Sequence, residues 1–257
     1  MWLPVMRGVI ERRILANYHV DPVYLARILP APFRPKLTHG WGIAGICLIR
    51  LQKVRPQFSP IAAGFSSENA AHRIAVEWDD QGVTCQGVYV PRRDTSSRLN
   101  TLVGGRLFPG VHHHARFDVH ESDRQLSVAL HSDDDRTHVA VEGTVSQIWP
   151  KTSVFESLTE ASSFFEVGSL GYSPTACPGV FDSLELRTFT WHLEALNVTQ
   201  IRSSFFEDPA IFPPGAVQFD SALLMRNIEH EWHGKPRLES HSGQVDTLPS
   251  DRTAVAE

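Results

Sequence analysis

Strand-length segments separated by short polar turns dominate this chain and restrict the folds that it can adopt. The clearest pair, residues 73–78 and 83–90, is joined by Asp79-Asp80-Gln81-Gly82, a polar turn of hairpin length. Such short connections join strands that run antiparallel to each other. The same pattern predicts a meander of three more strands at residues 117–120, 125–131 and 137–149.

Further strand-like segments lie on both sides of this region. We expect them at residues 9–17, 43–54, 184–198, 200–206 and 217–232, with the second of these largely buried. Many strands, few helices and hairpin-length turns indicate an α+β protein that is mainly antiparallel β-structure. We expect its curved sheet to close or half-close around a cavity.

Two helices have clear start and stop signals. Asp21 is suited to cap a helix, Pro22 suits its first position, and Pro30 ends it. Ser153-Val154-Phe155-Glu156 has the pattern of a capping box and predicts a second helix that ends at Gly168. The remaining assignments are a short helix within residues 99–107 and connections at residues 91–98 and 169–179.

The composition is that of a globular protein without a strong charge bias. The 257 residues are 42% apolar and 21% charged, which is enough to bury one sizeable core. We expect one domain over residues 1–234 and a polar, disordered tail over residues 235–257. A net charge of −5 argues against a general nucleic-acid-binding role.

Cysteine usage and the N-terminal segment favour a cytoplasmic location. Cys47, Cys85 and Cys177 are odd in number and far apart, so they predict neither a disulfide framework nor a zinc ribbon. Residues 1–13 lack the apolar run of a signal peptide, and no segment is long and apolar enough to span a bilayer. Dinucleotide, P-loop and serine-nucleophile motifs are absent from the sequence, and we expect no cofactor.

The densest group of titratable side chains follows a turn at residues 104–110. Here His112-His113-His114 leads into an alternating, strand-like stretch. Side chains alternate across a strand, so His112 and His114 are expected to share one face while His113 occupies the other. Imidazoles in a pocket near Arg106 can accept protons, which makes His113 and His114 candidate general bases.

Other interpretations of the histidine run stay open. Two histidines at positions i and i+2 can share a metal ion, with Glu68, His72 or His230 as a third ligand. The run is also compatible with a surface position and no chemistry at all. We assign no metal to this protein.

Arginines near the same segment can hold a carboxylate. Arg92, Arg93, Arg98 and Arg106 are candidates for a bidentate grip, although surface ion pairing with Asp94 is the commoner role of such groups. We select Arg106, together with His112 and Tyr89, as the candidate substrate-binding residues.

Three segments resemble a known family. They are Val20-Asp21-Pro22 through Leu29-Pro30, the segment Asp94-Thr95-Ser96-Ser97-Arg98-Leu99, and Gly105-Arg106 followed by the histidine run. They are similar to the YqjF-like proteins, a family of unknown function within the acetoacetate-decarboxylase-like superfamily. The resemblance covers residues 10–232 in segment order. It implies a curved, cone-like β-barrel with a few flanking helices and an internal pocket.

The resemblance also bears on chemistry. The decarboxylases have a Gly-Arg-Glu segment that leads into Pro-Lys-Lys, and the first lysine forms a Schiff base with the keto acid. Gly105-Arg106 matches the Gly-Arg, but Leu107 replaces the Glu and His113 occupies the position of that lysine, with His114 beside it. An imidazole cannot form an iminium with a ketone as a primary amine does. Glu68 is the nearest match to the acidic pocket residues of the relatives.

We therefore expect a pocket protein for a small, carboxylate-bearing or keto-acid-like molecule. If it is an enzyme, it is a lyase, hydratase or isomerase that uses no Schiff-base lysine, with His113, His114 and Glu68 as catalytic residues. The competing hypothesis is a non-catalytic protein that binds its ligand in the same pocket. We expect neither a membrane nor a nucleic acid as partner, and exposed sheet edges leave room for a homodimer.

Overall fold

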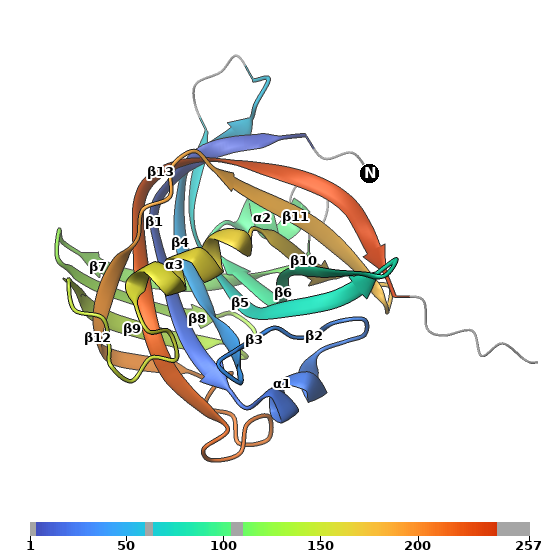
Figure 1. The fold of residues 1–257 in the computed structure, drawn as a ribbon. Coiled ribbons are helices and arrows are strands. Elements are labelled where there is room, and N and C mark those ends of the chain that lie inside the picture. Colours follow the sequence, from blue (N-terminus) through green and yellow to red (C-terminus); the bar gives the residue numbers. More distant parts are fainter. Residues whose placement is uncertain (1–3, 60–63, 104–109, 241–257) are drawn as a thin grey trace, which may run out of the picture.

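A computed structural model describes residues 4–59, 64–103 and 110–240. Three short helices, α1 (Pro22–Ile28), α2 (Arg98–Val103) and α3 (Leu158–Val167), accompany a large sheet (Figure 1). The strands are β1 (Met6–Val20), β2 (Arg34–Pro35), β3 (Leu37–Thr38), β4 (Trp41–Pro56), β5 (Phe65–Asp80), β6 (Val83–Thr95), β7 (His112–Glu121), β8 (Gln125–Ser132), β9 (His138–Ser146), β10 (Leu170–Pro174), β11 (Val180–Thr188), β12 (Glu194–Ser203) and β13 (Val217–Glu239).

The strands form one curved sheet that closes on itself. Their order is β11-β10-β6-β7-β8-β9-β12-β13-β1-β4-β5-β2, and two further pairings, β11 with β13 and β5 with β6, complete rings of strands. Neighbours are antiparallel except for β6 with β7 and β6 with β10. The predicted class, mainly antiparallel with a curved sheet and few helices, is confirmed.

The long central strands are buried on both faces. In β1, Ile14 belongs to an apolar cluster with residues of β8, β9 and β12, whereas the adjacent Leu15 belongs to a second cluster with Phe155 and Phe165. A strand covered on both sides needs apolar side chains at successive positions. This explains the continuous apolar run of residues 43–49 in β4. Helix α3 crosses the face of the sheet that carries Leu15 (Figure 1).

The ends of the helices follow capping chemistry. Asp21 caps α1 as predicted, since its Oδ1 accepts a hydrogen bond from the amide of Val23 at 2.8 Å. The predicted start of the helix at Ser153 is wrong. Ser157 caps α3, while the hydroxyl of Ser153 donates to Asp220 at 2.7 Å. The helix ends at Gly168, as predicted.

Several strand boundaries differ from the prediction. Strand β6 continues through the charged residues 91–95, and residues 170–174 form β10 where a connection was expected. The predicted strands 184–198 and 200–206 are instead β11, which ends at Thr188, and β12, which ends at Ser203. Strand β13 extends to Glu239 because its last residues pair with β11, so the predicted boundary of the tail at residue 235 is wrong. Residues 241–257 lie outside the described residues.

The hairpin between β5 and β6 is confirmed. Gln81 and Gly82 at its tip both have positive φ angles, 49° and 82°, as a two-residue hairpin turn requires. In the part of the chain that the structure describes, none of the helices is both long enough and apolar enough to cross a membrane.

Candidate functional site

The histidine run begins strand β7. Its three residues pair in parallel with Arg93, Asp94 and Thr95 at the end of β6. Gly110 precedes the run with a φ of 88°, and a Cβ at this position would lie 2.8 Å from the Cβ of Ser173. The turn into β7 therefore requires glycine.

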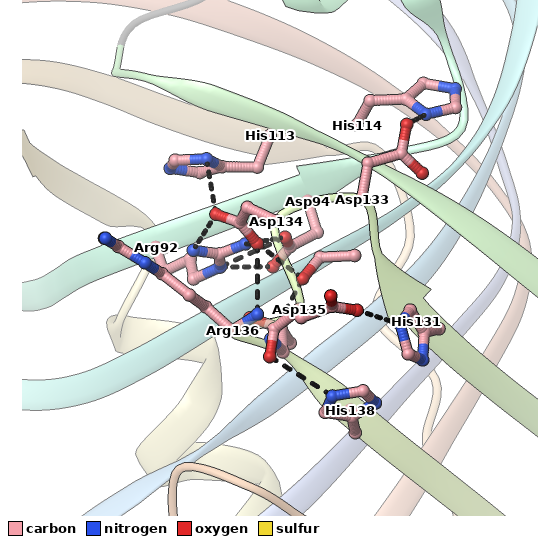
Figure 2. Close-up of polar contacts among 12 residues, drawn as sticks. Arg92, Asp94, His113, His114, His131, Asp133, Asp134, Asp135, Arg136 and His138 are labelled. Atoms are coloured by element: carbon pink, nitrogen blue, oxygen red, sulfur yellow. Dashed lines mark hydrogen bonds and ion pairs between the residues drawn. The ribbon is translucent and has the colours of Figure 1, made fainter.

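His113 and His114 contact the carboxylates of a surface turn. His113 Nδ1 lies 3.3 Å from Asp134 Oδ2, and His114 Nδ1 lies 2.8 Å from Asp133 Oδ2 (Figure 2). Asp134 also binds Arg92, which in turn binds the buried Asp94 (Figure 2). The described cavities do not include His113 or His114 in their walls, so a general-base role for them stays a prediction from the sequence alone.

His112 is the member of the run that lines a cavity. Its Nδ1 lies 3.2 Å from the carbonyl oxygen of Gly110, and its side chain borders a cavity together with Arg93 and Asn100. Burial, with a further contribution from Arg93, lowers the pKa of His112 to about 4. The imidazole is therefore neutral at pH 7.

Glu68 belongs to an ion-pair network. Its two carboxylate oxygens accept hydrogen bonds from Arg12 and Arg50, each at 2.5 Å, and Glu121 also pairs with both arginines. Arg12 is only 2% exposed. Because Glu68 neutralises a buried guanidinium and lines neither of the two inner cavities, its contacts are those of a structural residue.

Tyr89, a predicted substrate-binding residue, lines neither of the two inner cavities. Tyr89 lies in the aromatic core, with ring centroids 5.6 Å from Phe33 and 6.1 Å from Phe181, and burial raises its pKa. Arg106 lies outside the described residues.

The possible third metal ligands, Glu68, His72 and His230, do not form a group of three with the histidine run in the described residues. His72 is 2% exposed, and His230 is completely buried. Burial is the main cause that lowers the pKa of each to about 4. Within the described ranges, neither joins the histidine run in a group of three potential ligands.

Two adjoining cavities lie on the face of the sheet that α3 covers. Their volumes are about 130 Å³ and about 90 Å³. The larger is bordered by small residues of β5, β6 and β10, namely Ala71, Ala75, Gly87 and Gly171. Both cavities share the following wall residues: Arg13, Cys47, Ala71, Arg93, Leu184, Leu186 and Trp232.

Three arginines line the larger cavity. Arg13 contacts the sulfurs of Cys47 and Met225, Arg73 donates to Asn17, and Arg93 donates to Ser173 at 3.1 Å. Over the residues that the structure describes, none of the three forms an ion pair with a carboxylate. By contrast, Arg12, Arg50 and Arg92 in the same part of the sheet are paired with acids.

The positive charges of these three guanidinium groups are therefore not balanced by ion pairs among the described residues. Arg73 is 7% exposed, its Nε has no hydrogen-bond partner, and its guanidinium lies 4.6 Å from the ring of Phe165. Burial lowers the pKa of both Arg73 and Arg93 to about 10, which leaves them protonated at neutral pH. A buried cation without a counter-charge is costly, and a bound anion removes that cost.

Two more charged groups border the larger cavity. Lys36 lies with its ammonium 4.4 Å from the ring of Phe164, and burial lowers the pKa of its amine. Glu166, at the end of α3, is exposed. The balance of charge around the cavity is clearly positive.

Only one of these arginines, Arg93, was predicted from the sequence as a candidate for binding a carboxylate. Arg13 and Arg73 were not predicted to bind a ligand. Their one local signal is a position directly before an apolar, buried residue, Ile14 in β1 and Ile74 in β5. Charged side chains are seldom buried in a strand unless a partner or a cavity meets them.

Solved structures of similar fold are acetoacetate-decarboxylase-like. The acetoacetate decarboxylase of Legionella pneumophila has a TM-score of 0.60 and 12% identity, with 91% of this chain and 87% of that chain covered. An acetoacetate decarboxylase-like enzyme from Sphingomonas wittichii RW1 has a TM-score of 0.58 and 15% identity, with 92% and 93% covered. The enduracididine biosynthesis enzyme MppR complexed with pyruvate has a TM-score of 0.59 and 12% identity, with 94% and 93% covered.

These similarities show the fold, which is the acetoacetate-decarboxylase-like fold that the resemblance implied. No match was found among curated proteins. The model of the DUF2071 family, described as "Uncharacterized conserved protein", matches residues 9–205. On this match across most of its length, the chain belongs to the DUF2071 family, which corresponds to the YqjF-like proteins that its sequence resembles.

Proposed function

We propose that this protein binds a small carboxylate-bearing molecule of the keto-acid type in the larger cavity. Arg73 and Arg93 hold the carboxylate, with Arg13 beside them. The observation that carries the proposal is the set of three arginines that face one cavity without an acidic partner among the described residues. Guanidinium groups bind carboxylates through paired, charge-assisted hydrogen bonds.

The dimensions of the cavity support a small ligand. A protein cavity of about 150 Å³ holds a molecule of about six heavy atoms such as benzene. The cavity here, at about 130 Å³, is of similar size. Pyruvate has the same number of heavy atoms, and it is the ligand of the structurally similar enzyme MppR.

If the protein is an enzyme, we propose lyase, hydratase or isomerase chemistry with a neutral histidine as proton acceptor. His112 is better placed for this role than His113 or His114, because it borders the cavity that adjoins the arginines. Its depressed pKa keeps it unprotonated at pH 7. A non-catalytic binding protein would use the same arginines and show no turnover.

A titration with charged and uncharged ligands tests the proposal. Pyruvate is expected to bind, whereas pyruvamide, which has the same shape without the charge, is expected to bind at least tenfold more weakly. Arg73→Met and Arg93→Met should each abolish the difference in affinity between pyruvate and pyruvamide. The control is Arg237→Met. Arg237 is an exposed residue near the end of β13 and pairs with Asp182 of β11. Equal affinity for the two ligands in the unmodified protein would contradict the proposal.

A second candidate function follows from Lys36. It is the lysine of the described ranges that lines the cavity, and burial lowers the pKa of its amine. A neutral amine adds to a ketone, and loss of water then gives an imine. Borohydride reduction in the presence of pyruvate would trap that imine as a permanent mass increase on Lys36. The leading proposal predicts no such adduct, whereas an adduct at Lys36 would establish the second candidate.

A further inference from the structure

The hairpin between β8 and β9 brings two histidines and an aspartate together. His131 and His138 are directly opposite each other on the two strands, and Asp135 lies in the turn that joins them. All three side chains are exposed. None of them lines either of the arginine-rich cavities, so this group is separate from the proposed ligand site.

The potential ligand atoms of these three residues are close to one another. Each residue offers one nitrogen or carboxylate oxygen, and these atoms all lie within 4.8 Å of each other. His131 Nε2 lies 2.7 Å from Asp135 Oδ1, and the centroids of the two imidazole rings are 4.0 Å apart. Figure 2 shows Asp135 beside both imidazoles: His131 contacts its carboxylate, and His138 Nε2 lies 3.2 Å from its backbone carbonyl oxygen.

The turn itself is fixed by hydrogen bonds. The hydroxyl of Ser132 donates to Asp134 at 2.6 Å and accepts from the amide of Thr137 at 2.9 Å. The carboxylates of Asp133 and Asp134 already pair with His114, His113 and Arg92. Asp135 is therefore the carboxylate of this turn that is left to the histidine pair.

We propose that His131, Asp135 and His138 bind a divalent transition-metal ion, with Zn²⁺ as the ion that suits them. Two imidazoles and one carboxylate provide the nitrogen and oxygen donors that Zn²⁺ accepts, and a water completes the tetrahedron. Ligand atoms at about 2.0–2.1 Å from Zn²⁺ are about 3.3 Å apart in such a site. The contact between His131 and Asp135, now 2.7 Å, needs to open by about 0.6 Å, and ligand atoms that are now up to 4.8 Å apart need to move closer, to reach this separation.

Metal titration of the full, untagged chain tests this site. After treatment with a chelator, the protein is titrated with Zn²⁺ by calorimetry, and its thermal unfolding is followed at increasing Zn²⁺. Co²⁺ is used in parallel, because its visible absorption bands report nitrogen and oxygen ligation. The variants are His131→Gln, Asp135→Asn and His138→Gln. His120→Gln is the matched control, since the exposed His120 pairs with Asp118 at 3.1 Å in the neighbouring hairpin but lacks a third ligand in the described residues.

We expect one Zn²⁺ per chain and a rise in melting temperature that depends on the Zn²⁺ concentration. Each of the three variants should weaken the affinity at least about tenfold, whereas the control variant binds as the unmodified chain does. The absence of saturable binding would overturn the proposal. It would also be overturned by binding that survives all three substitutions, because the ion would then be held elsewhere, for example by the exposed Cys177.

Discussion

Arg13 donates a hydrogen bond from Nε to the Sγ of Cys47 at 3.4 Å, between the adjacent strands β1 and β4. Both residues line the larger cavity, so the thiol lies in a pocket whose charged groups are mostly cationic. Arg73 and Arg93 face the same space, and their positive charges act on the same thiol. This relationship makes Cys47 a reporter of the electrostatic potential inside the cavity.

The first prediction uses that reporter. Cys47 should react with iodoacetate faster, relative to iodoacetamide, than the exposed Cys177 does, because cations attract the charged reagent. Comparing the two reagents at one thiol removes the effect of that thiol's own ionisation. Peptide mass spectrometry gives the four rates, and we expect the ratio at Cys47 to exceed that at Cys177 several-fold. Pyruvate should protect Cys47 alone, and equal ratios would contradict a positive cavity.

Glu68 is predicted to act on stability rather than on ligand binding. Glu68→Gln removes the charge that Arg12 and Arg50 share and leaves the buried Arg12 with Glu121 as its acidic partner. Breaking a buried pair in this way costs about 3 kcal/mol of unfolding free energy. Urea denaturation measures the loss, and the affinity of the folded variant for pyruvate should not change. A loss of turnover without a loss of stability would instead support the catalytic role expected from the sequence.

Acid should destabilise the protein through its buried histidines. The pKa of His72 is lowered to about 4 in the folded chain, chiefly by burial and then by Arg92, so the unfolded chain binds its proton at a higher pH. Stability from this residue is therefore complete above about pH 6.5 and is lost as the pH falls towards 4. The expected loss between pH 7 and pH 5 is about 2 kcal/mol for this histidine.

Two substitutions isolate this effect. His72 packs against Phe205 and Phe206, with ring centroids at 5.2 Å and 6.3 Å, so His72→Leu keeps an apolar contact and removes the titration. Between pH 7 and pH 5, the free energy of unfolding from urea denaturation should fall less for this variant than for the unmodified chain. His192→Leu, at an exposed position, should keep the full difference. An unchanged pH dependence in His72→Leu would show that another group causes it.

Separate substitutions of His112 and His113 show which of the two histidines takes part in ligand binding or turnover. His113 pairs with Asp134 at the surface, so His113→Ala should leave the affinity for pyruvate within about twofold of its original value. His112→Gln changes a residue of the cavity wall and should alter binding, or turnover if there is any. If His113→Ala changed the affinity and His112→Gln did not, His113 would be the functional residue.

Local signals in the sequence predicted much of the fold. Asp21 before Pro22 and Gly82 at a hairpin tip specify their structures through interactions within a few residues, and both predictions are confirmed. Ser153 has the same kind of signal, but its hydroxyl binds Asp220, 67 positions away, and the helix begins later. Tertiary contacts of this kind cannot be deduced from neighbouring residues.

The site was harder to predict for the same reason. Arg13, Arg73 and Arg93 come from β1, β5 and β6, and they share a cavity only because the sheet curves and closes. The histidine run attracted attention because it is contiguous in the sequence, yet two of its members bind the aspartates of one turn. A cluster of titratable residues in the sequence is therefore a weaker guide to this site than buried arginines that lack an acidic partner in the structure.

A crystal structure of the protein soaked with pyruvate tests the central claim most directly. The account predicts density in the cavity beneath α3, with the carboxylate within hydrogen-bond distance of at least two of the guanidinium groups of Arg13, Arg73 and Arg93. A carboxylate held instead by His113 and His114, or a cavity that stays free of pyruvate at saturating concentration, would contradict it.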